Sequence, residues 1–400
     1  MKRILIFNIG QIVSGDLDRP LLEGDTVLVE GGKIAAVGKG TDLSGASADI
    51  RVNANGMTLT PGLIDPHVHP AIGDWTPRQK TIGWIESYVH GGITTMLSQG
   101  SSNLQGRPSD RAGAKALAIL SQKTYENFRP CNAKMQAAVM LEKGMTEDDF
   151  KEMAAEGVRL VAEIGGGGAY RIDEVGPMVA WAKKYGMKIN VHFGARFLLG
   201  SANILTKDVL AIDPDVAVHV NGGSTAPPFE EFKELADRGN CALEFIHNGN
   251  PKATYKGIKY LAERDMLRRV TVGSDSPTGI GVIPLAILRI VVQISSINEI
   301  PAAKALAFAT GNTAKAYGLH TGRTQKGLDA DLLLMDAPCD SVAKDALGAI
   351  EAGDNPAITM VMIDGSIVTD RARNTASTDR RIEIDGLPRS FTSLDEFLKY

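Results

Sequence analysis

The feature that most constrains the fold of this sequence is a repeated alternation of short apolar runs and amphipathic helical patterns between residues 60 and 319. Helical stretches such as 146–157 and 228–239 lie between the apolar runs. Eight such β–α units over about 260 residues match the usual size of a (β/α)8 barrel. The eight runs are residues 62–69, 93–100, 134–140, 159–165, 188–194, 216–222, 241–249 and 270–276.

The rival architecture is an open, doubly wound sheet. Such a sheet normally carries a GxGxxG turn after its first strand, and none is present there. The four consecutive glycines at 165–168 are not followed by GK[ST], so they do not form a Walker phosphate loop. We expect these small residues to let backbone and substrate approach closely after the fourth strand. The predicted fold class is therefore α/β, with a TIM barrel.

Both chain ends have a different sequence pattern, which predicts short strands separated by turn residues. The segment VLVE-GG-KIAAVG near the start and MIDGSIV near the end each predict a β-hairpin. We expect the two ends to pair into one small β-sandwich. The predicted domains are residues 1–59 as its N-terminal part, 60–319 as the barrel, and 320–400 as its C-terminal part plus a tail, with Pro61-Gly62 at the first boundary.

The overall charge and cysteine content exclude several classes of protein. The net charge of −4 implies no strongly basic face, which argues against a nucleic-acid partner. The three cysteines are far apart and form no CxxC pair, which argues for a reducing compartment. The apolar segment after the first residues is too short for a signal peptide, and no apolar run approaches the ~18 residues of a membrane span. We expect a cytoplasmic protein without a membrane partner.

Polar residues recur where the predicted barrel strands end. His67 and His69 end the first run, and residues i and i+2 on a strand point to the same side. A lone histidine at a strand end is most often a hydrogen-bonded loop residue, and a lone aspartate can simply cap the next helix. The recurrence on several strands outweighs that interpretation, because the chemistry of a barrel lies at the C-terminal ends of its strands. The further residues are Glu163, His192, His219 and Asp275.

These residue types indicate a metal centre. Neutral imidazole and carboxylate are ligands for Zn, Fe(II), Mn or Ni. Six such groups are too many for one tetrahedral ion and suit two bridged ions roughly 3.5–4 Å apart. His247 stays open between a supporting role, a substrate contact and packing, while His90 and His320 are expected to be structural.

Taken together, TPGLIDPHVH, the glutamate, the two single histidines, the GSD aspartate and the segment KGLDADLLLMD resemble the amidohydrolase superfamily. The resemblance covers nearly the whole chain and implies a barrel flanked by a small β-sandwich. Within the superfamily, the segments PRQKT (77–81), HGGITTM (90–96) and LEKGMTEDDF (141–150) are similar to the enamidases. That resemblance implies a glutamate bridge where many relatives use a carboxylated lysine.

Several expectations follow from the resemblance. They are hydrolysis of a C–N bond in a cyclic amide, a role in nicotinate degradation, a homotetramer, and one Zn and one Fe ion or two Zn ions. The ligands carried over by position are His67, His69, Glu163, His192, His219 and Asp275. The alternatives are a dihydroorotase-, hydantoinase- or imidazolonepropionase-type enzyme, a mononuclear deaminase, or a barrel retained for binding alone.

The mechanistic hypothesis assigns two tasks to Asp275. Two bound ions would supply a hydroxide that attacks the amide carbon, and Asp275 would accept its proton and deliver it to the departing nitrogen. A small cyclic amide that carries a carboxylate would need a basic partner near the centre. Arg78 and Arg196 are the candidates for that contact.

Overall fold

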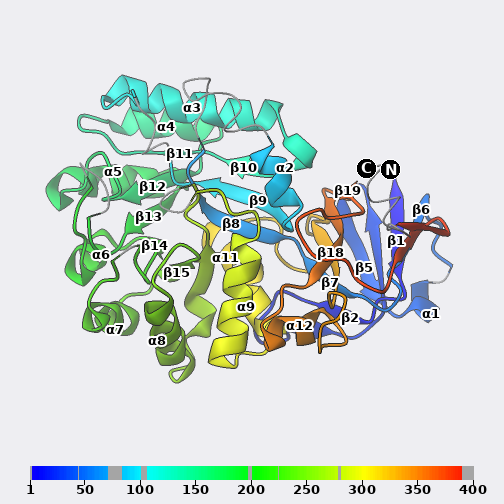
Figure 1. Ribbon diagram of the computed structural model, residues 1–400. Helices are drawn as coiled ribbons and strands as arrows, with labels where there is room; N and C mark the ends of the chain where they lie inside the picture. The colour runs from blue at the N-terminus through cyan, green and yellow to red at the C-terminus, as the bar shows by residue number, and fades with distance from the viewer. Residues whose placement is uncertain are drawn as a thin grey trace.

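The computed structural model describes residues 2–43, 45–70, 83–100, 106–196, 201–223, 225–277 and 281–389. Figure 1 shows two regions side by side: parallel strands surrounded by helices, and a strand-rich region that contains strands from the beginning and from the end of the chain. Arg78, a predicted substrate contact, and the residues from 390 onward lie outside the described part.

The central strands run parallel in two hydrogen-bonded sheets, β10-β9-β8 and β11-β12-β13-β14-β15-β16. The third predicted run is not one strand, because it is interrupted at Ala137, whose backbone N–H donates to the Gln122 side chain instead of a neighbouring strand. The strands are β8 (Leu63–Val68), β9 (Ile93–Ser98), β10 (Lys134–Gln136), β11 (Ala138–Val139), β12 (Leu160–Ile164), β13 (Lys188–His192), β14 (Val216–Val218), β15 (Ala242–Ile246) and β16 (Val270–Gly273).

The first and last of these strands lie beside each other. An isolated parallel bridge joins Val68 to Ser276. The backbone N–H of Asp275 donates to the carbonyl of His67 at 3.0 Å, and that of His69 donates to the carbonyl of Ser276 at 2.8 Å. These bonds bring the residues after β16 next to the end of β8.

Helices follow the strands and cover them, as the sequence pattern predicts (Figure 1). In α7 the residues Phe232, Leu235 and Ala236 are buried, which is the apolar stripe expected of a helix that packs on a sheet. The helices are α1 (Gly40–Leu43), α2 (Trp84–Val89), α3 (Arg111–Asn127), α4 (Glu147–Ala155), α5 (Ile172–Lys184), α6 (Thr206–Ile212), α7 (Phe229–Arg238), α8 (Pro251–Ala262), α9 (Ala286–Asn298), α10 (Ala302–Phe308), α11 (Gly311–Tyr317) and α12 (Ala346–Ala352).

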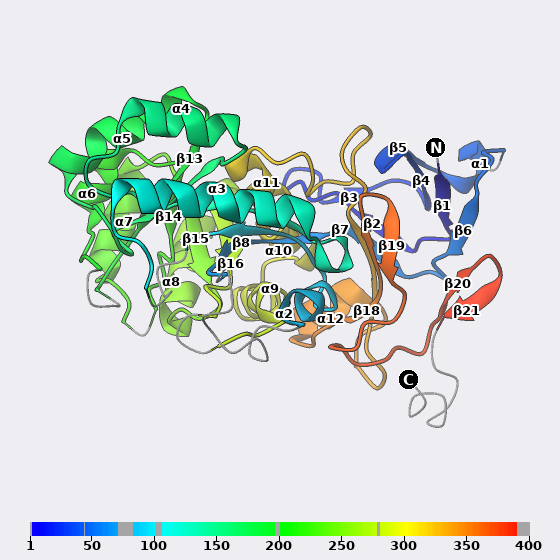
Figure 2. The same cartoon turned by 90° about the horizontal axis from the view of Figure 1, so that it is seen from above.

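The chain ends form two further sheets, ordered β21-β20-β6-β1-β4-β5 and β19-β18-β17-β7-β2-β3. Figure 2 shows β20 and β21, from the end of the chain, next to β6 from its beginning. The strands are β1 (Arg3–Phe7), β2 (Gln11–Val13), β3 (Leu21–Leu22), β4 (Thr26–Glu30), β5 (Lys33–Gly38), β6 (Ile50–Asn53), β7 (Thr58–Pro61), β17 (Leu332–Asp336), β18 (Ala357–Ile363), β19 (Ser366–Thr369), β20 (Ile382–Ile384) and β21 (Leu387–Arg389).

Both predicted hairpins are confirmed. Strands β4 and β5 pair antiparallel with Glu30 opposite Lys33, and β18 and β19 pair with Ile363 opposite Ser366. The two end sheets share an apolar cluster that is separate from the main core and includes residues of both chain ends, such as Ile6 and Leu334. Within the described residues, no helix has the length and apolar character needed to cross a membrane.

Candidate metal centre

The ends of five strands bring the predicted ligands to one place. His67 belongs to β8, Glu163 to β12 and His192 to β13. His69 and His219 directly follow β8 and β14. Asp275 lies two residues beyond β16. Because the strands are parallel, their carboxyl ends meet at the same end of the fold.

The ligand atoms form two groups that share one carboxylate. His67, His69 and Glu163 make one group, and Glu163, His192 and His219 make the other, with the ligand atoms of each group within 4.8 Å of one another. Oε2 of Glu163 lies 2.8 Å from Nε2 of His219 and 3.4 Å from Nδ1 of His192, and Oε1 lies 3.7 Å from Nε2 of His69. Glu163 therefore has the position of a bridge.

Asp275 faces the first histidine pair from the last strand. Its Oδ1 lies 3.2 Å from Nε2 of His69 and 3.4 Å from Nε2 of His67. Its backbone has a left-handed φ of 59°, and Nδ2 of Asn248 donates to its carbonyl oxygen at 2.8 Å. His219 has a left-handed φ of 41°. Such conformations are strained for non-glycine residues and cluster at functional sites.

The donor set fits two divalent cations. The four histidines and Glu163 are buried, and the Asp275 side chain is 14% exposed. Nε2 of His67 is buried without a hydrogen-bond partner among the described residues. An unpartnered buried nitrogen is costly, whereas a cation bound there in place of a proton would be its partner.

The charges of the centre also favour cations. Burial alone would lower the pKa of His67, but the attraction of the Glu244 and Asp275 carboxylates outweighs it and raises that pKa to about 10. Burial alone would raise the pKa of Glu163, but hydrogen bonds from His192 and His219 outweigh it and hold that pKa well below its usual value. The pKa of Asp275 is likewise lowered, against burial, by the neighbouring His67 and His69. The carboxylates are therefore anionic and draw positive charge to this place.

Two buried carboxylates beside the centre are absent from the sequence-based site. Glu244 on β15 contacts Nδ1 of His67 at 2.7 Å. Asp65 on β8 accepts the backbone N–H groups of His67 at 3.1 Å and Ser274 at 3.0 Å, and burial raises its pKa to about 7. The signal that could have revealed both is a single carboxylate inside an otherwise apolar strand, LIDPHV for Asp65 and ALEFI for Glu244.

The two predicted substrate contacts that the structure describes are less buried than the predicted ligands. Arg196 is exposed in the loop after β13, and His247 is half-buried after β15 with a pKa that burial lowers. Arg78 is outside the described residues. His90 accepts the backbone N–H of Arg373 at 3.3 Å, and His320 is exposed, so neither belongs to the two ligand groups.

The glycine run after β12 packs closely against the side chain of Glu163. A Cβ atom at Gly166 would lie 2.6 Å from Oε1 of Glu163, closer than side chains tolerate. Gly165 has a left-handed φ of 101°. These two positions therefore need glycine, in line with the expected close approach of the backbone at 165–168.

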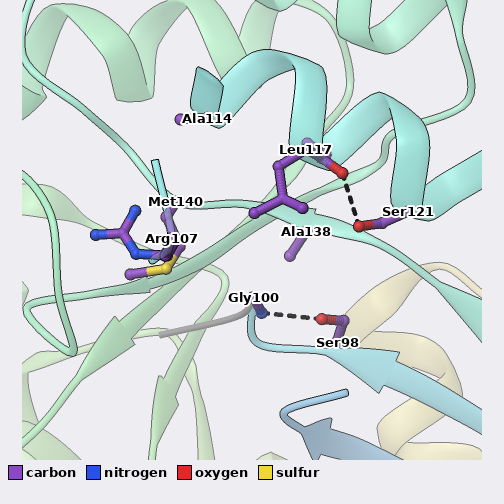
Figure 3. A pocket seen from close by; sticks show the side chains of 9 residues that line it. Ser98, Gly100, Arg107, Ala114, Leu117, Ser121, Ala138 and Met140 are labelled. Atoms are coloured by element: carbon purple, nitrogen blue, oxygen red, sulfur yellow. Dashed lines mark hydrogen bonds between the residues drawn. The ribbon is translucent and has the colours of Figure 1, made fainter. Parts of the chain in front are cut away.

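A small cavity lies between α3 and the ends of β9 and β11 (Figure 3). Its link to the centre is Gly100, whose carbonyl oxygen lies 3.2 Å from Nδ1 of His69. The lining is mostly small or aliphatic, and its charged residue, Arg107, pairs with Glu142 at 2.7 Å. We interpret the cavity as space beneath α3.

The comparisons with known proteins agree on one family. The model of the amidohydrolase family matches residues 217–368. The enamidase of Eubacterium barkeri is 46% identical over 385 residues, which cover 96% of this chain and 100% of that protein. A crystal structure of enamidase superposes with a TM-score of 0.92 at 46% identity, over 96% of this chain and 100% of that one.

More distant relatives share the fold with other activities. A 5′-deoxyadenosine deaminase of Methanosarcina barkeri is 23% identical, covering 96% of this chain and 97% of that protein. A dihydropyrimidinase structure from Brevibacillus agri has a TM-score of 0.66 at 17% identity, covering 94% of this chain and 100% of that one.

Proposed function

Because this chain belongs to the amidohydrolase family, we propose that it is a metal-dependent hydrolase that opens a cyclic amide as an enamidase does. It acts on carbon–nitrogen bonds other than peptide bonds. The observation that carries the proposal is the position of Glu163 between two histidine pairs, in a chain 46% identical to an enamidase along nearly its full length. The deaminase-like alternative is supported by relatives that are 22–23% identical.

The fold of the family is a TIM barrel. We further propose that the barrel closes between β8 and β16, which the Val68–Ser276 bridge supports. The two end sheets and their shared apolar cluster support a β-sandwich. We propose domains at 1–59, 60–319 and 320–400.

Two divalent cations are the proposed cofactors, either Zn and Fe or two Zn, since borderline metals suit imidazole and carboxylate ligands. His67, His69 and Asp275 would hold the first ion, His192 and His219 the second, and Glu163 would bridge them. When bound, such a pair polarises a carbonyl group and lowers the pKa of water.

Asp275 is the proposed general base and acid. Its lowered pKa keeps it ionised near neutral pH, so its Oδ1 can accept a proton from the attacking water. The protonated Oδ1 then donates that proton to the departing nitrogen, and the ring opens at the C–N bond. A single carboxylate can perform both transfers because nucleophile and leaving group share one carbon. From a cyclic enamide, ring opening yields an enamine, whose tautomerisation and further hydrolysis release ammonia and an aldehyde.

The substrate and setting are proposed from the resemblance and the composition. The substrate is a small cyclic amide that carries a carboxylate, as in nicotinate degradation, and Arg78, Arg196 and His247 are the proposed contacts. A homotetramer and a cytoplasmic location belong to the same proposal.

The experiment that tests this function is a hydrolysis screen on protein of known metal content. The panel contains six-membered cyclic amides with and without a carboxylate, together with 5′-deoxyadenosine. We expect ring opening, fastest for an unsaturated ring that bears a carboxylate. Deamination of the nucleoside without ring opening of any amide would contradict the proposal.

A further inference from the structure

Glu244 is a buried carboxylate that the proposed reaction does not use. It lies on β15 with no exposed surface, and its Oε1 is 2.7 Å from Nδ1 of His67. A charged group in such a place is costly unless it is paired, and His67 is its partner in the structure. Its other oxygen, Oε2, is buried without a hydrogen-bond partner among the described residues.

The contact fixes which nitrogen of His67 can bind a cation. A carboxylate oxygen accepts hydrogen bonds, so the contact keeps a proton on Nδ1 and leaves Nε2 as the nitrogen at which a cation can take the place of a proton. That Nε2 atom faces the centre, 3.4 Å from Oδ1 of Asp275. A carboxylate behind a ligand histidine both orients the ring and increases its basicity.

The neighbouring strand β16 has a glycine where it packs against this pair. A Cβ atom at Gly273 on β16 would lie 2.9 Å from Cβ of His67 and 3.1 Å from Cδ of Glu244. Glycine at this position therefore allows the imidazole and the carboxylate to pack against each other without a displacement of either.

The partners of the Nδ1 atoms differ between the two proposed cation sites. The Nδ1 atoms of His69 and His219 face backbone carbonyls, Gly100 at 3.2 Å and Phe193 at 3.3 Å. The Nδ1 atom of His67 instead faces the carboxyl group of Glu244 at 2.7 Å. Glu244 thus adds a third carboxylate to Glu163 and Asp275, and it adds it on the side of His67 and His69.

We propose that Glu244 is a positioning residue for His67 and makes the His67–His69 position the tighter of the two cation sites. The proposal rests on the two-metal centre proposed above. It assigns Glu244 no contact with substrate, so its effect is on cation affinity and, through the cation, on turnover.

The test uses the full-length variant Glu244→Gln, which keeps the shape of the side chain and removes its charge. Zn²⁺-loaded protein is equilibrated with increasing chelator, and the metal per chain is measured by mass spectrometry. We expect the wild-type curve to have two steps. The first step is the loss of the ion at the His192–His219 position, and the second is the loss of the tighter ion at the His67–His69 position. In Glu244→Gln we expect the affinity for the tighter ion to fall about 10–100-fold, so that the second step moves toward the first, while the first step stays in place.

Glu142→Gln is the matched control. Glu142 is also a buried glutamate, but it pairs with Arg107 rather than with a candidate ligand histidine. We expect this variant to keep the wild-type chelation curve. A curve of Glu244→Gln identical to that of the wild type, or an equal weakening of both steps, would overturn the proposal.

A measurement on the wild type keeps the proposal testable even if Glu244→Gln fails to fold. In Zn²⁺-loaded protein with ¹⁵N-labelled histidine, the nuclear magnetic resonance signals of His67, assigned with a His67→Asn variant, should show a protonated Nδ1 and a metal-bound Nε2. A metal-bound Nδ1 would overturn the inference alone, whereas a wild type that binds fewer than two ions would overturn both it and the proposed centre.

Discussion

Oε2 of Glu163 lies 2.8 Å from Nε2 of His219, although 56 positions separate the two residues along the chain. The other oxygen, Oε1, faces His69 from the first strand at 3.7 Å. One carboxylate thus reaches both histidine pairs, and the proposed two-metal centre depends on it more than on any single imidazole.

Removal of that carboxylate should reduce the metal content. In Glu163→Ala both proposed ions lose a ligand, and the histidine pairs lose the negative charge between them. We expect the metal content to fall from two ions per chain to one or fewer, measured by elemental analysis. The Glu142→Gln protein, purified in parallel, should keep two. Two full equivalents in Glu163→Ala would contradict the bridging role.

Substitution of Asp275 should separate proton transfer from metal binding. Asp275→Asn keeps an oxygen near His67 and His69 but cannot accept and return a proton. We expect the metals to stay largely in place and kcat to fall by roughly 10²–10⁴-fold, the usual contribution of a general acid–base. Turnover close to that of the wild type would exclude this role.

The pH dependence of stability should reveal the contribution of the ionised side chain of Asp149, a buried residue at the start of α4. Burial opposes its ionisation, but hydrogen bonds from Arg111, Thr146 and Lys115 outweigh that and lower its pKa from 3.8 to about 2. The stability that this lowered pKa contributes is present above pH ~4 and is lost as the pH falls toward 2.

Asp149→Asn should therefore destabilise the chain by about 1–3 kcal/mol at pH 7 and by less at pH 3. Urea unfolding at the two pH values, with chelator present throughout, measures the difference. A destabilisation that is the same at both pH values would show that the effect comes from packing or from the helix N-terminus instead of the charge.

The substrate carboxylate should reveal its partner through KM. If Arg196 pairs with it, Arg196→Ala removes a charge-assisted hydrogen bond, which is worth about 10–100-fold in affinity. KM should rise by this factor for the acid and much less for its amide. Arg238→Ala is the control, since Arg238 is exposed at the end of α7 and pairs with Glu234 there. Equal changes in KM for acid and amide would exclude Arg196.

Sequence periodicity was sufficient to predict the parallel strands, the helices between them and the grouping of the candidate ligands, because these follow from strand and helix geometry. His67 and His69 share a side of β8 by their spacing, and parallel strands bring Glu163, His192 and His219 to the same end. The residue types then indicated the chemistry.

What the sequence did not reveal depends on individual side-chain contacts. Glu244 matters because β15 lies near His67, a contact between residues 177 positions apart. The interruption at Ala137 depends on one side chain, Gln122, which competes with the strand ladder. Neither contact follows from a repeating pattern in the sequence, so the sequence alone does not predict them.

The most direct test of the two-metal hydrolase is the dependence of ring opening on metal equivalents. Metal-free protein is titrated with Zn²⁺, and hydrolysis of an unsaturated six-membered cyclic amide is followed at each step. Since the water and the carbonyl group are expected to need both ions, activity should stay low through the first equivalent and rise across the second. Full activity after one equivalent would contradict the account.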